Sequence, residues 1–319
     1  MLKFKKILIM APIAGVTDRH FRKIVAEHGA GLTVSEMVSA KSIVYENKNT
    51  YRLLANDSPF SMGSQMPKTP FCRAQAPFSV QFFGHEPHIL KEAIKRLEAL
   101  PFEIVDINMG CPMPKIVKNG EGAALMKEPL LAGKLIAAAV SASHRPVTVK
   151  IRKGFTPATA NAVEMAKIAQ ESGATAIAVH GRTRDQFYTG EADWHAIAAV
   201  KDAVKIPVIG NGDIFTPETA VTRLQSGACD AVMLARGALG NPWLFSRTLA
   251  LLETGVCPPP PSHCEIIETA LQHLHAADNI LEMRKHLCWY TKGMPNSAQI
   301  RRKINTAKTK SEMEEILTL

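Results

Sequence analysis

The chain has 319 residues, 46% of them hydrophobic, which is enough to bury the core of one large barrel or of two ordinary domains. Its formal net charge of +9 favours a polyanionic partner, but many enzymes are mildly basic without one, so charge alone decides nothing. The six cysteines include no Cys-x-x-Cys pair, which argues against a zinc site and a redox dithiol, and we expect no bound metal. Since no apolar stretch is long enough to span a bilayer, the sequence predicts a cytoplasmic protein without a membrane segment.

Eight short apolar runs, rich in valine and isoleucine, recur along the first three quarters of the chain. The first follows basic residues, as in a signal peptide, but Pro12 interrupts it, so we expect a strand there instead. Most runs are continuous rather than alternating, which predicts strands buried on both faces of a parallel sheet. The runs begin at Ile7, Leu32, Ser79, Ile104, Val147, Ala176, Pro207 and Ala231.

Segments with helical spacing lie between these runs, and several begin with threonine or proline and end with glycine, as helices do. Examples are residues 17–30, 87–100, 129–143, 158–174 and 216–228. Alternation of strand and helix over about 250 residues predicts an α/β fold, the (β/α)8 TIM barrel. A doubly wound open sheet is the alternative.

The chain changes character at CPPPPS, residues 257–262, where four prolines predict a stiff linker. The patterns beyond it are helical and carry no strand signals, which predicts a small all-α domain. We therefore divide the chain into a barrel, residues 1–254, and a helical domain, residues 255–319. A stretch rich in proline, serine and methionine, residues 56–77, predicts a long loop before the third strand.

Polar residues lie at the ends of the predicted strands, where a barrel builds its active site. A lysine inside a buried strand, Lys150, needs an anionic partner, which could be a strand-end acid such as Glu36 or Asp213. His180 could be a core histidine and Gln81 could bind backbone. Taken together, however, these polar residues at one level of the barrel predict a functional site. The strand-end residues are Glu36, Gln81, Asn108, Cys111, Lys150 and His180.

Two glycine-bearing loops, GNGDIFTPE and ARGALGNPW, follow the seventh and eighth strands. Loops at these positions of a barrel often hold a phosphate on backbone N–H groups, and Arg236 can add a charge-assisted hydrogen bond. Together with Gln81 and Lys150, they suit flavin mononucleotide, whose ring is tuned by nearby charge. A sugar phosphate would satisfy the same loops, so spacing alone does not separate the two.

Long motifs resemble the tRNA-dihydrouridine synthases, most closely their bacterial B-type branch. They are APIAGVTDRHFR, VDINMGCPMPKIVKNGEGAALM, VTVKIRKGF, VHGRTRDQFYTGEADW, PVIGNGDIFTPE, DAVMLARGALGNPWLF and RKHLCWYTKGMPNSAQIRRKIN. The resemblance implies an FMN-binding barrel with a helical RNA-binding domain. It also implies an oxidoreductase that reduces the C5–C6 double bond of uridine in tRNA, with NADPH as electron donor.

The resemblance implies a role for each matching residue. Cys111 is the expected proton donor to C5 of uracil, and Asn108 is expected to face the base. A thiol with a pKa near ~8.5 suits a general acid, although a small buried cysteine in a turn is the alternative. The implied cofactor-binding residues are Pro12, Ile13, Ala14, Gln81, Lys150, His180, Asn211, Gly212, Asp213, Arg236 and Gly237.

Basic residues crowd the C-terminal region, with no acidic residue between Arg284 and Lys310. In a protein that binds tRNA this run predicts the phosphate-binding surface, whereas elsewhere it would be an ordinary solvated face. The expected tRNA-binding residues are Arg182, Arg284, Lys285, Arg301, Arg302 and Lys303. We expect a monomer.

Two other functions remain open at this point. A dihydroorotate-dehydrogenase-like flavin barrel acting on a free pyrimidine would share the phosphate loops but would not need a basic helical domain. An RNA-binding barrel that has lost catalysis would not need Cys111, Lys150 and His180.

Overall fold

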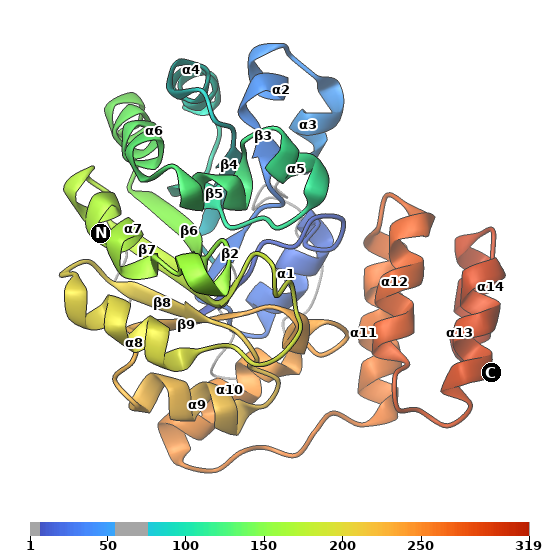
Figure 1. The fold of residues 1–319 in the computed structure, drawn as a ribbon. Coiled ribbons are helices and arrows are strands. Elements are labelled where there is room, and N and C mark those ends of the chain that lie inside the picture. The colour runs from blue at the N-terminus through green and yellow to red at the C-terminus, as the bar shows by residue number, and fades with distance from the viewer. Residues whose placement is uncertain (1–6, 55–75, 319) are drawn as a thin grey trace.

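Eight parallel strands close into a barrel in the computed structural model, which describes residues 7–54 and 76–318 (Figure 1). Each strand pairs in parallel with its neighbours, and pairing of β2 with β4 completes the ring. The TIM-barrel prediction is therefore confirmed, and the open doubly wound sheet is excluded. The barrel strands are β1 (Leu8–Met10), β2 (Leu32–Val34), β4 (Phe78–Phe83), β5 (Ile104–Met109), β6 (Val147–Gly154), β7 (Ala176–Thr183), β8 (Val208–Asn211) and β9 (Ala231–Leu234). A two-residue strand, β3 (Val38–Ser39), pairs with β4 beside the ring.

Helices cover the outside of the barrel (Figure 1). Several begin where the sequence places a capping residue: the side chains of Asp18, Asp193 and Thr216 accept a backbone N–H in the first turns of α1, α8 and α9. The helices of this layer are α1 (Arg19–Glu27), α2 (Ala40–Val44), α3 (Lys48–Leu53), α4 (Pro87–Leu97), α5 (Pro114–Lys118), α6 (Pro129–Ala142), α7 (Ala162–Glu171), α8 (Trp194–Ala203), α9 (Pro217–Gln225) and α10 (Trp243–Thr254). The predicted long loop at residues 56–77 lies outside the described residues except at its last two positions.

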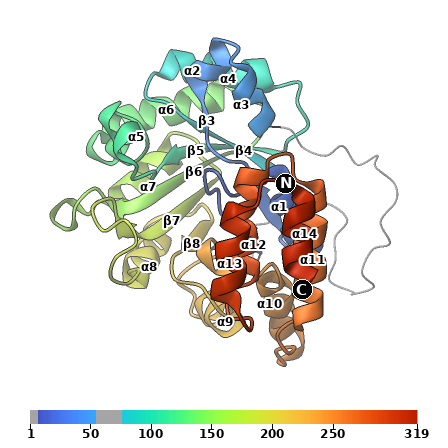
Figure 2. The ribbon, with the colours of Figure 1, turned by 90° about the vertical axis from the view of Figure 1, so that its right-hand side faces the viewer.

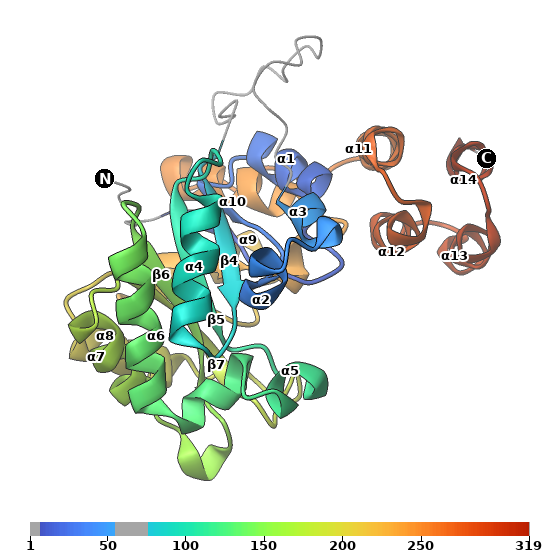
Figure 3. The ribbon, with the colours of Figure 1, turned by 90° about the horizontal axis from the view of Figure 1, so that it is seen from above.

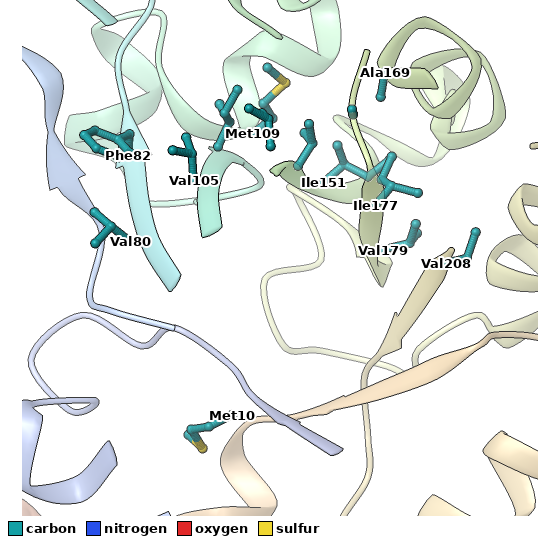
Figure 4. Close-up of a cluster of buried hydrophobic side chains, with 14 of the residues drawn as sticks. Met10, Val80, Phe82, Val105, Met109, Ile151, Ala169, Ile177, Val179 and Val208 are labelled. Atoms are coloured by element: carbon teal, nitrogen blue, oxygen red, sulfur yellow. The ribbon is translucent and has the colours of Figure 1, made fainter. Parts of the chain in front are cut away.

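The core forms two layers because successive residues of a strand point to opposite faces. Met10, Val80, Phe82 and Val105 belong to the layer that also contains the inner faces of the helices (Figure 4). Their neighbours in the strands, Ile9 among them, fill the inside of the barrel.

Strand register gathers polar residues at one end of the barrel. Asn108 of β5 lies opposite Lys150 of β6, and His180 of β7 lies opposite Asn211 of β8. Asn108 and Asn211 lie at or next to the carboxyl ends of β5 and β8, and the register places Lys150 and His180 of the longer strands β6 and β7 at the same level, at the end of the barrel where active sites form.

Four further helices pack beside the barrel and share their own buried apolar cluster (Figures 2 and 3). The proline-rich segment precedes them, and Ser262 begins the first with a capping box to Glu265. They are α11 (His263–Ala276), α12 (Ile280–Tyr290), α13 (Ser297–Thr306) and α14 (Lys310–Thr318). Within residues 7–54 and 76–318, no helix has the length and apolar character needed to cross a membrane.

Candidate active site

A cavity of about 370 Å³ opens at the carboxyl ends of the barrel strands. This volume lies in the range of pockets that hold small molecules and cofactors. The cavity brings together residues from across the barrel that the sequence analysis singled out separately. Those that line it are Pro12, Ile13, Ala14, Gln81, Asn108, Cys111, Lys150, His180, Asn211, Gly212, Asp213, Arg236 and Gly237.

A chain of hydrogen bonds fixes the amide of Gln81. Its Nε2 donates to Asp106 Oδ2 at 2.6 Å, and its Oε1 accepts from Asn108 Nδ2 at 2.7 Å. The Thr148 hydroxyl donates to the other Asp106 oxygen at 2.5 Å. Burial raises the pKa of the Asp106 carboxyl. Gln81 is thus held by side chains rather than by backbone, and Asp106 is a supporting residue that the sequence analysis missed.

The ammonium of Lys150 donates a hydrogen bond to Asn211 Oδ1 at 3.2 Å, and no carboxylate in the described part of the chain forms an ion pair with it. Burial lowers its pKa to about 8. The two partners expected for it are wrong: Glu36 accepts the backbone N–H of Gly15, and Asp213 pairs with arginines. The cavity therefore presents a cation that lacks an anion.

Arg182 and Asp213 form a bidentate ion pair, with N–O distances of 2.6 and 2.8 Å. Asp213 also accepts from Arg236 at 3.0 Å and from the backbone N–H of Ala192 at 2.8 Å. Arg182 is only 2% exposed and also donates to the carbonyls of Thr189 and Gly190. Its expected place on the tRNA-binding surface is therefore wrong, because the guanidinium is buried and engaged inside the protein.

Cys111 stands on a tight loop whose geometry is set by its neighbours. The side-chain oxygen of Asn108 accepts the backbone N–H groups of Gly110 and Cys111 at 3.1 and 2.9 Å, and the Cys111 carbonyl accepts the Ala123 N–H at 3.0 Å. Gly122 has a φ of +59°, and a Cβ there would lie 2.8 Å from the Cys111 carbonyl oxygen. Burial raises the pKa of the Cys111 thiol, so the thiol holds its proton at neutral pH.

The family model described as "Dihydrouridine synthase (Dus)" matches residues 9–318. The chain belongs to the dihydrouridine synthase family. Within this family it is similar to a "Probable tRNA-dihydrouridine synthase" of Rickettsia conorii, with 42% identity over 93% of this chain and 88% of the relative. It is also similar to a "tRNA-dihydrouridine synthase B" of Xanthomonas axonopodis, with 40% identity over 95% of this chain and 89% of the relative. The expected family is confirmed.

A solved structure of histamine dehydrogenase from Rhizobium sp. 4-9 has the same fold at only 11% identity, with a TM-score of 0.54. The match covers 84% of this chain and 48% of that chain. At this identity the likeness supports the barrel alone, whereas the family match extends through the C-terminal helices.

The cavity lining also includes residues that were not predicted from the sequence, among them Met37, Arg152, Tyr188 and Trp289. Arg152 donates to the Gly110 carbonyl at 2.8 Å and so supports the loop that carries Cys111. Trp289 comes from α12, outside the barrel. A Cβ on Gly240 would lie 2.3 Å from the Trp289 carbonyl carbon, so only glycine allows this close approach between the barrel and α12.

The basic residues of the C-terminal helices differ in their availability to RNA. Lys285, Arg302 and Lys303 are exposed and Arg301 is half-buried. Arg284 donates to the Ala307 carbonyl at 2.6 Å, so its guanidinium is partly used in joining α12 to the end of α13. Its role as a tRNA contact stays a prediction, and the structure adds a structural role beside it.

Proposed function

We propose that the protein is a tRNA-dihydrouridine synthase that reduces the C5–C6 double bond of uridine in tRNA, with FMN as cofactor and NADPH as electron donor. The arrangement of Cys111 carries the proposal: a thiol kept protonated by burial lies in the wall of a cavity that also presents an ammonium without an ion pair. The activity also fits the names of the relatives to which the chain is similar.

The cavity fits a flavin mononucleotide. Pro12, Ile13 and Ala14 supply an apolar wall, and Lys150 supplies the charge that an anionic ring requires. Gln81 and His180 would contact the ring as well. The residues that would hold the ribityl phosphate side are Asn211, Gly212, Asp213, Arg236 and Gly237.

When bound and reduced, the flavin supplies a hydride to C6 of uracil. The side chains of the protein would supply the proton and the positioning that the reduction also requires. Cys111 would deliver a proton to C5, while the hydrogen bonds from the Gly110 and Cys111 backbone to Asn108 hold the loop in place. Burial lowers the pKa of His180, and nearby cations lower it further. The imidazole is therefore neutral and can act as a hydrogen-bond donor.

We place tRNA recognition on the helical domain, residues 255–319, and catalysis on the barrel, residues 1–254. The exposed side chain of Lys285 lies beside the barrel rim: its Nζ is 3.4 Å from the position that a Cβ on Gly15 would occupy. The other proposed phosphate contacts are Arg301, Arg302 and Lys303, and the target base would leave its stack to enter the cavity. With tRNA as substrate, we expect a monomer that acts in the cytoplasm.

The test is mass spectrometry of unmodified tRNA incubated with the purified protein, FMN and NADPH, with a Cys111→Ala variant in parallel. A gain of two hydrogens on a uridine, lost or strongly reduced in the variant, supports the proposal. NADPH oxidation by flavin-loaded protein without any such gain overturns it and favours the free-pyrimidine reductase, which assays with orotate and uracil would then identify.

A further inference from the structure

Two histidines and one aspartate meet where the C-terminal helices pack against the barrel. Asp18 begins α1 of the barrel, whereas His273 and His286 come from α11 and α12. One potential ligand atom from each of the three residues lies within 4.8 Å of the other two. The cluster is separate from the catalytic cavity, whose lining includes none of the three.

The imidazoles are fully buried, and each has a ring nitrogen whose hydrogen-bonding capacity is not used. Within the described ranges, Nε2 of His273 and Nε2 of His286 lack a hydrogen-bond partner. Both side chains are 0% exposed, so water does not reach them from the surface. Buried polar atoms normally find a partner, because leaving one unsatisfied costs about 1–3 kcal/mol. Two such atoms that both face Asp18 call for a common partner.

The free oxygen of Asp18 lies between the two rings. Its Oδ1 accepts the Phe21 backbone N–H at 2.8 Å, which leaves Oδ2 to face the histidines. The distances from Oδ2 to Nε2 are 3.8 Å for His273 and 3.7 Å for His286. These distances are too long for hydrogen bonds. They are close to the spacing of ~3.3 Å between ligand atoms that sit ~2 Å from a tetrahedral zinc ion.

The surroundings also match those of a metal site. A histidine ligand normally uses its second nitrogen in a hydrogen bond that fixes the ring. For His273 that partner is in place, because its Nδ1 lies 3.4 Å from the buried hydroxyl of Tyr290. Phe21 packs against both rings, with ring centroids 5.9 and 5.1 Å away, and so supplies an apolar wall.

We propose that Asp18, His273 and His286 bind a divalent first-row transition metal, zinc or ferrous iron, that joins α1 of the barrel to α11 and α12. Two neutral imidazoles and one carboxylate suit both ions. A water would take the fourth position on the side of Asp18, whose side chain is 19% exposed. The sequence analysis expected no metal because it considered cysteine pairs, whereas these ligands are far apart in the chain and meet only in the fold. The inference does not depend on the catalytic activity.

The first test is metal uptake by the full-length protein. After treatment with a chelator and dialysis against zinc or anaerobic ferrous iron at low free concentration, we expect about one metal ion per chain by elemental analysis. The Tm of the metal-free protein should rise with added metal. If neither zinc nor iron binds and neither changes the Tm, the proposal is wrong.

Variants then locate the ion. Asp18→Asn retains the helix cap, because asparagine caps as well as aspartate, but removes the anionic ligand; His286→Gln removes one imidazole. Both should lose the metal. His275→Ala is the matched control, since His275 lies on α11 but pairs with Glu314 at the surface, and it should bind as the wild type does. Equal uptake by Asp18→Asn or His286→Gln, folded by circular dichroism, would assign the metal to another site and overturn the proposal.

Discussion

The side chain of Asn108 organises the loop that carries Cys111: its Oδ1 lies 2.9 Å from the Cys111 backbone nitrogen, while its Nδ2 donates to Gln81. One amide thus connects the proposed proton donor to a residue of the proposed flavin site. Disturbing it should affect the reacting geometry before it affects the fold.

We expect Asn108→Ala to slow uridine reduction about 100-fold, because small displacements of a reacting group have effects of that size. Flavin reduction by NADPH should change far less, since it does not need the Cys111 loop. Stopped-flow measurement of the two half-reactions separates the effects. Equal losses in both would show that Asn108 acts mainly on the cofactor.

Replacement of Cys111 by alanine should lower kcat for tRNA reduction by about 10²- to 10⁴-fold, the usual contribution of a positioned general acid. Cys264→Ala serves as the control, because Cys264 is an exposed free thiol on α11. Single-turnover rates with reduced enzyme provide the comparison. Wild-type rates in the Cys111 variant would remove it from the reaction.

The affinity for FMN should depend on pH through Lys150. Its pKa of about 8 in the free protein should rise when an anionic ligand binds. Affinity is therefore constant below about pH 8 and falls by up to about tenfold per pH unit above it, as binding takes up one proton. Titration of apoprotein with FMN between pH 6 and 10 measures this. A Lys150→Met variant should bind more weakly and show no such fall.

The pair between the buried Arg182 and Asp213 should matter for stability. We expect Arg182→Met to lower the free energy of unfolding by about 3 kcal/mol, because Asp213 loses its bidentate partner and keeps only Arg236 and the Ala192 N–H, while two carbonyls lose their donor. Urea denaturation of apoprotein reports this as a shifted midpoint at unchanged slope. Arg96→Met, which removes a surface pair with Glu92 on α4, should cost much less.

The exposed basic residues of α13 should control tRNA affinity without affecting chemistry. A double variant, Arg302→Ala and Lys303→Ala, should weaken tRNA binding and reduce the slope of log affinity against log salt by about 1 for each lost phosphate contact. Lys167→Ala, on α7 of the outer layer, is the matched control. An unchanged slope would place the RNA on another surface.

The barrel could be predicted because its signals are local. A strand buried on both faces, such as β9, needs an unbroken apolar run, and the start of a helix such as α9 is marked by Thr216 and Pro217. The carboxyl ends of the strands of a barrel share one end of the fold, so predicted strands alone were enough to bring Lys150, His180 and Asp213 into one cavity.

What could not be predicted depends on contacts between distant parts of the chain. Arg182 follows the apolar run that predicts β7, as a surface arginine would, and only the fold shows that it is buried and bound to Asp213 and two loop carbonyls. Asp106 carries the same signal as Lys150, a charged residue inside a predicted buried strand, but its partners Gln81 and Thr148 come from other strands and are visible only in the fold. His273 and His286 belong to helices whose pattern says nothing about Asp18.

Trp289 of α12 lines the cavity where the base would react, so the C-terminal helices form part of its wall. The close approach at Gly240 leaves no room for an intervening side chain, so α12 meets the barrel backbone directly. The two parts are therefore not interchangeable modules. A chimera that carried another helical domain on this barrel would also replace one wall of the cavity. Its RNA preference and its reaction rate would therefore change together.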